Sequence, residues 1–167
     1  MKLIKNMLKE FIETTDLCKS LAMCELSNAD ISDKLFGVIP KVYPSWYLTW
    51  KFSYRTKLKE LDSNIKNLKN NIAYLESLLK LISTSKEENY KHLLIEDLKE
   101  NTPEEIAKKL EKTIKDLKEI LEMIKSSYEI FKKINNSGTI LSLSWIREVF
   151  GGLCASYDTI KLKIKNM

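Results

Sequence analysis

The sequence predicts an all-α protein: a bundle of four main helices and one or two short ones, built around a long antiparallel, coiled-coil-like hairpin. Two apolar stripes and a shortage of turn residues predict this fold class. The first stripe alternates spacings of three and four residues and contains Leu58, Leu61, Ile65, Leu68, Ile72, Leu75, Leu79 and Ile82. The second stripe follows the same rule and contains Ile106, Leu110, Thr113, Leu117, Ile120, Ile124, Ser127, Phe131 and Ile134. With four glycines and three prolines in 167 residues, the chain has few turns, and we expect a single domain over residues 1–167.

The first third of the chain is predicted to contain one helix and a connector. Apolar side chains recur every three or four positions over residues 2–25, which predicts a helix there. Ser27 and Asn28 are expected to break this helix, and a short helical turn over residues 29–36 is expected to end at Gly37. Residues 38–44 hold two prolines and are therefore expected to connect this part to the next helix.

The long first stripe predicts a helix over residues 46–83, with Ser45 placed as its N-cap. At 1.5 Å per residue this helix is roughly 55 Å long. The Ser-Thr-Ser sequence at 83–85 is expected to end it. A shorter helix is expected over residues 86–99, with Tyr90, Leu94 and Leu98 on one face.

The clearest local signal precedes the second stripe. Thr102, Pro103 and Glu105 have the arrangement of a capping box, in which the threonine caps and the glutamate reaches back to the cap residue. This signal predicts a helix over residues 103–134. The sequence Asn-Asn-Ser-Gly at 135–138 is expected to end it.

The C-terminal helix is predicted over residues 139–160. Gly151 and Gly152 lie in its middle, where glycine weakens a helix, so the pair predicts either a break or a close contact with another helix. Residues 160–165 alternate between apolar and basic side chains, and this period of two leaves their conformation open.

The two stripes differ in width. The second stripe is widened on one flank by apolar residues, namely Ala107, Ile114, Leu121 and Tyr128. A wide face contacts more than one neighbour, so the 103–134 helix is expected to lie centrally in the bundle. Because both stripes belong to one chain, we expect them to pair within the molecule. A homo-oligomeric contact through the 46–82 helix stays open as the alternative.

The composition of the chain limits the cellular compartment and the kinds of partner that we expect. The net charge of +5 is spread along the chain without a basic block, which weakens the prediction of a dedicated nucleic-acid surface. Cys18, Cys24 and Cys154 form no C-x-x-C pair and are expected to be reduced thiols, with Cys18 and Cys154 in the core. No segment is apolar enough to be a signal peptide or to span a bilayer, so we expect a cytoplasmic protein.

The residue inventory also argues against catalysis. His92 is the only histidine, and with Glu88 and Glu96 it forms a set at spacings of four that departs from the spacing of known carboxylate–histidine metal sites. An exposed helix face with pairing between residues four apart explains this set better than a metal or acid–base site. Neither a G-x-S-x-G motif nor a phosphate-binding glycine motif is present. We therefore expect no enzyme activity, no metal and no cofactor.

An aromatic and basic segment is the candidate partner-binding site. It consists of Tyr43, Trp46, Tyr47, Trp50, Tyr54 and Arg55. Tryptophan and tyrosine dominate the energetics of protein interfaces, but they also stack on nucleic-acid bases and anchor proteins at membrane surfaces. A fourth interpretation is that these side chains fill one end of the bundle core.

These observations lead to two hypotheses on function. The first is a non-catalytic helical interaction module, that is, a scaffold, adaptor or inhibitor that presents helix faces to a protein partner. The alternative is a nucleic-acid-associated accessory protein that binds phosphates non-specifically through dispersed lysines and the aromatic segment. Salt separates the two, because binding to phosphates weakens steeply as the salt concentration rises.

Overall fold

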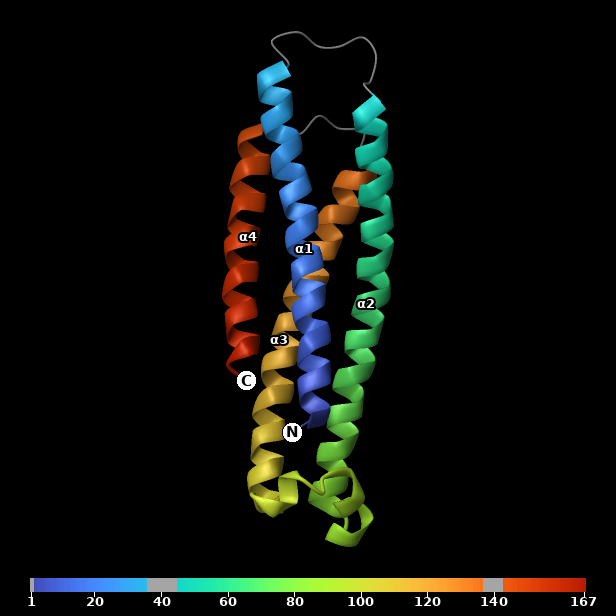
Figure 1. Cartoon of the computed structure of the whole chain (residues 1–167), viewed down its shortest axis with the longest axis vertical. Coiled ribbons are helices and arrows are strands. Elements are labelled where there is room, and N and C mark those ends of the chain that lie inside the picture. Colours follow the sequence, from blue (N-terminus) through green and yellow to red (C-terminus); the bar gives the residue numbers. More distant parts are fainter. Residues whose placement is uncertain (1, 36–44, 137–142) are drawn as a thin grey trace.

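The computed structural model describes the whole chain except residues 1, 36–44 and 137–142, and it describes side chains over residues 4–27, 53–134 and 144–167. The described residues form four α-helices: α1 (Lys2–Leu35), α2 (Ser45–Thr84), α3 (Pro103–Asn136) and α4 (Leu143–Lys165). Successive helices run in opposite directions along one long axis (Figure 1). The predicted all-α bundle is confirmed, and no strand occurs among the described residues.

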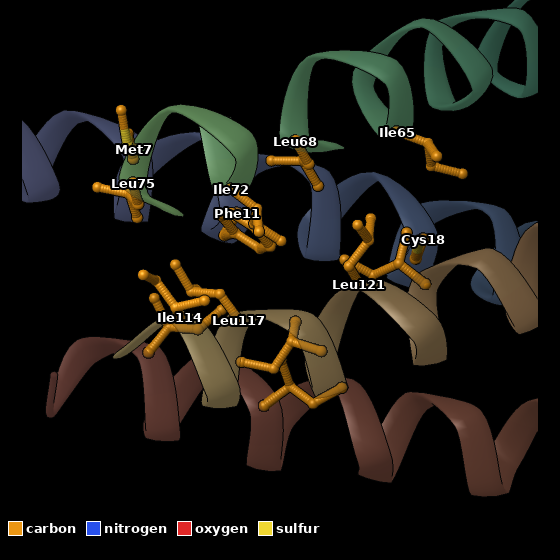
Figure 2. Packing of buried hydrophobic residues seen from close by; sticks show 14 of the residues in the cluster. Met7, Phe11, Cys18, Ile65, Leu68, Ile72, Leu75, Ile114, Leu117 and Leu121 are labelled. Atoms are coloured by element: carbon orange, nitrogen blue, oxygen red, sulfur yellow. The ribbon is translucent and has the colours of Figure 1, made fainter. Parts of the chain in front are cut away.

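Both apolar stripes lie in the core. Every residue of the first stripe is buried except Leu79, which is half-buried, and every residue of the second is buried except the half-buried Ile134. The two stripes meet along the hairpin of α2 and α3, and α1 adds Phe11 and Cys18 to the same cluster (Figure 2). The 3.5-residue spacing therefore places one continuous seam between antiparallel neighbours within the chain.

The helices pack most closely as two pairs, α1 with α4 and α2 with α3, and α1 also packs against both α2 and α3. The central helix is α1, which packs against all three others, and not α3 as predicted. The wide face of α3 packs mainly on α2 and also on α1, whereas α3 meets α4 only at isolated contacts such as Phe131 with Phe150 and Asp116 with Lys163. A homo-oligomeric contact through α2 remains a prediction.

The predicted break at Ser27 and Asn28 is wrong, because α1 continues as one helix to Leu35. Serine and asparagine lower helix stability by less than about 1 kcal/mol each, which tertiary packing readily outweighs. The packing is visible in the preceding turn, where Leu21, Ala22 and Glu25 are all buried.

The predicted helix over residues 86–99 is also wrong. The chain instead forms three short 3₁₀ turns, Glu87–Asn89, Lys91–Leu93 and Asp97–Lys99. The turns bring Tyr90 and Leu94 into the core, where both are buried. A regular helix of this length would project beyond the end of the hairpin, whereas tighter turns let the chain reverse direction within a short distance.

The capping box is confirmed at the start of α3. The Thr102 backbone N–H donates to Glu105 Oε2 at 2.8 Å, and the Glu105 N–H donates to Thr102 Oγ1 at 3.3 Å. These two reciprocal bonds satisfy backbone donors that have no partner inside the helix. They fix where the chain turns back after the 3₁₀ segment.

The C-terminal helix differs from its prediction. Residues 139–142 lie outside the described part, and α4 continues through residues 160–165 as a regular helix. Ile160 and Ile164, four residues apart, are buried, whereas Leu162 between them is 62% exposed. Gly151 and Gly152 lie inside α4 and are exposed, and a Cβ added at either meets no described atom within 4 Å. The glycine pair therefore marks neither a break nor a close helix contact.

We expect Gly151→Ala and Gly152→Ala each to stabilise the protein by about 0.5–1 kcal/mol. The reason is that alanine restricts the unfolded chain more than glycine, while the added methyl group points into open space. Denaturant unfolding of the two single variants and the double variant measures the change. A loss of stability in the double variant contradicts the open surroundings seen here.

Candidate functional site

The structure separates the members of the predicted aromatic site. Tyr43 lies outside the described residues, and Trp46, Tyr47 and Trp50 belong to the described backbone of α2 but not to the described side chains. Arg55 is exposed, whereas Tyr54 is 2% exposed and lies in the core. For Tyr54, then, the structure agrees with the core interpretation and not with an exposed contact residue.

Tyr54 belongs to an aromatic junction that joins three helices. Its ring meets Phe131 of α3 edge-on, with ring centroids 6.4 Å apart, and its hydroxyl donates to the Phe131 carbonyl oxygen at 3.4 Å. Phe131 stacks on Phe150 of α4 at 5.8 Å, and Trp145 meets Phe150 edge-on at 6.3 Å. Aromatic pairs in these geometries add to the stabilisation from burial alone.

Glu25 of α1 completes this junction with a buried carboxyl group. Its side chain is 4% exposed, and its Oε1 has no hydrogen-bond partner among the described residues. Burial raises the pKa of Glu25 to about 7, and a hydrogen bond with the Tyr54 side chain opposes this rise. The pKa of Tyr54 is raised as well, first by burial and then by the neighbouring carboxylate charge.

The apolar spacing of α1 contains the signal that leads to Glu25. The stripe of α1 runs through Cys18 and Ala22, and Glu25 lies three residues further on the same face. An acidic residue at such a position is either at the edge of the core or buried in it. The helix over residues 2–25 was predicted from its apolar side chains alone, so Glu25 was not predicted to be buried.

Lys57 contacts Cys24, the residue before Glu25, and already has partners. Lys57 of α2 lies with its Nζ 2.9 Å from Ser20 Oγ and 3.8 Å from Cys24 Sγ, both on α1. The ammonium group therefore sits at the half-buried edge between the two helices. None of the described contacts joins it to Glu25.

The three cysteines are free thiols in different environments. Cys18 is buried as predicted, and burial raises its pKa to about 12. Cys154 is half-buried, not in the core, because it lies at the margin of the α1–α4 contact beside Lys19 and Asp158. Burial raises the pKa of Cys154 too, so neither thiol is activated as a nucleophile.

The set of Glu88, His92 and Glu96 does not form one helical face. His92 lies in the second 3₁₀ turn, Glu88 in the first, and Glu96 precedes the third, with all three side chains exposed. Within the described part of the chain, no group of three histidine, cysteine, aspartate or glutamate side chains is placed to hold a metal ion.

A groove on the outside of the α2–α3 hairpin is the other candidate. It has a volume of about 580 Å³ and a floor of Leu79 and Ile114. Its walls carry Glu76, Lys80, Glu111, Lys115 and Lys118. Glu76 and Lys118 form an ion pair across the groove. The arrangement is an open groove over the half-buried Leu79 and the buried Ile114, between charged walls with three lysines against two glutamates.

Comparisons of the chain with family models, with curated proteins and with solved structures found no match in any of the three. Among the described helices, none combines the length and the apolar character needed to cross a membrane.

Proposed function

We propose that this chain is a non-catalytic helical module that binds a protein partner through its helix faces. The α2–α3 groove is the observation that carries the proposal. Apolar grooves with charged walls bind the apolar face of an amphipathic helix, and the charged walls then select its flanking residues. The proposal places the module in a reducing, cytoplasmic compartment, since its three cysteines are free thiols.

The chemistry of the groove defines the kind of partner. Leu79 and Ile114 offer an apolar floor, and lysines outnumber glutamates on the walls. A helix with one apolar face and acidic flanking residues matches this surface by charge and by polarity. Arg55 is exposed near the other end of α2. The same proposal therefore includes a role for residues 43–55 in binding the partner.

The test is affinity capture from the native source with wild-type protein and two double variants. Lys80→Glu with Lys115→Glu reverses the charge of the groove walls without changing its floor. Lys5→Glu with Lys59→Glu makes the same change in charge at exposed positions outside the groove. We expect the groove variant to recover roughly tenfold less of one specific protein, equivalent to about 1.4 kcal/mol, and the control to recover as much as wild type.

Salt separates this proposal from the nucleic-acid alternative. A protein held on an apolar floor is retained as the salt concentration rises, whereas binding to phosphates falls steeply. If nucleic acid is the captured species and is released by salt, the alternative is supported. Equal recovery with both double variants rejects the groove as the binding surface.

A further inference from the structure

We propose that Glu25 is a pH-sensitive latch: its protonated form keeps α1 and α2 packed around Glu25 and Tyr54, and its ionised form opens this packing. This inference concerns the conformation of the bundle and does not depend on the proposed partner. It rests on where the carboxyl group lies and on which groups surround it.

The carboxyl group lies at a point where several helices converge. Glu25 comes from α1, the Tyr54 side chain that bonds to it comes from α2, and the Tyr54 hydroxyl also reaches the Phe131 carbonyl of α3. The Glu25 side chain is almost fully buried, and its Oε1 has no hydrogen-bond partner among the described residues. A protonated carboxyl tolerates this site, but an ionised one loses its hydration without sufficient compensation.

The described groups around the latch do not supply a compensating positive charge. On α1 the neighbour is the Cys24 thiol, on α2 it is Tyr54, and on α4 the Tyr157 hydroxyl is close enough to affect Tyr54. The part of α3 at the junction offers the Phe131 carbonyl, which is an acceptor. Lys57 of α2 lies near the neighbouring Cys24, and its described contacts are with Ser20 and Cys24.

The position of Glu25 along α1 favours local opening around Glu25 and Tyr54 over unfolding of the whole bundle. The core is continuous from this junction towards the opposite end through Leu21, Leu58 and Leu61. Beyond Glu25, Leu26 is half-buried and Ser27 is exposed. Water therefore reaches the carboxylate if α1 and α2 separate only around Glu25 and Tyr54, and the seam from Leu61 onwards stays packed. Local openings of this kind cost less than global unfolding.

The experiment is amide hydrogen exchange of the full chain between pH 5 and pH 8, with protection corrected for the intrinsic pH dependence of exchange. The latch segments are residues 18–27 and 53–58, and residues 106–124 of α3 are the internal reference. We expect protection of the latch segments to fall on the order of 100-fold across this range, because a pKa shift of one unit is a factor of ten in the equilibrium. The reference segment is expected to lose at least tenfold less protection than the latch segments.

Variants link the change to Glu25. In Glu25→Gln the latch segments are expected to keep their protection at pH 8, and Glu25→Met serves the same purpose if the glutamine variant does not fold. Glu129→Gln, at an exposed position of α3, is expected to respond like wild type. The proposal is overturned if wild-type protection does not change with pH, if all segments lose protection equally, or if the uncharged variants respond as wild type does. Wild-type protection would also be independent of pH if Lys57 moved towards Glu25 and compensated its charge.

Discussion

Replacing Phe131 with alanine is expected to cost about 3–5 kcal/mol of unfolding free energy, the largest loss that we predict for one side chain. Phe131 is fully buried, and its ring contacts Tyr54 of α2 and Phe150 of α4. Truncation removes the apolar contacts, leaves a cavity between three helices and ends both ring interactions. The Phe131 carbonyl that accepts the Tyr54 hydroxyl belongs to the backbone and is kept.

Urea unfolding, followed by circular dichroism, measures the loss. Tyr74→Ala is the matched control, since it removes an aromatic ring from an exposed position on α2 and is expected to cost less than about 1 kcal/mol. If the two variants lose the same stability, the aromatic junction does not stabilise the bundle as its geometry implies.

The sequence predicts the long helices of the bundle and the residues that pack between them, but not the segment that joins the two helices of the hairpin. Both stripes were predicted at the level of single residues. The alternating spacing of three and four residues recurs many times along each helix, and each recurrence supports the same assignment. The capping box was predicted as well, since its two hydrogen bonds depend on residues three apart. The conformation of residues 86–99 was predicted wrongly. The spacing of Tyr90, Leu94 and Leu98 is helical, but the chain must reverse direction here because of the two long helices on either side.

Single residues that interrupt a pattern were interpreted less well. Ser27, Asn28 and the Gly151–Gly152 pair lower helix propensity, yet each lies in a continuous helix because packing of neighbouring turns outweighs about 1 kcal/mol per residue. Glu25 shows the opposite case. Its charge suggests an exposed position, and only its spacing from Cys18 and Ala22 indicates that it is buried. At the candidate site, the sequence indicated the segment that contains Tyr54, but it did not indicate which helix the Tyr54 side chain contacts.

Global stability is expected to depend on pH through Glu25, with a direction opposite to that of a carboxylate whose pKa is lowered by folding. The pKa of Glu25 rises from 4.5 to about 7 on folding, so the native state binds more protons than the unfolded state between these values. The free energy of unfolding therefore falls as the pH rises from about 4.5 to about 7 and changes little above that range. One pKa unit corresponds to about 1.4 kcal/mol, so the loss amounts to at most about 3 kcal/mol.

Glu25→Gln is expected to remove this dependence and to be more stable than wild type by up to about 3 kcal/mol at pH 8, while the two proteins differ little at pH 5. Urea unfolding at pH 5, 6, 7 and 8 measures both proteins, and Glu129→Gln is expected to follow wild type because its carboxyl group is exposed. A wild-type stability that rises between pH 5 and pH 7 contradicts the burial of an ionisable carboxyl at this junction.

The size of this loss also reports on the latch. If Glu25 ionises in place, the native state bears the full desolvation cost, and the loss approaches the upper value of about 3 kcal/mol. If α1 and α2 separate around Glu25 and Tyr54, the carboxylate is hydrated, and the loss is limited to the free energy of that local opening. The denaturant slope then also falls at high pH, because an opened native state has less surface left to expose on unfolding. A loss below the upper value together with a smaller slope above pH 7 is therefore the thermodynamic signature expected of a bundle that opens locally around Glu25.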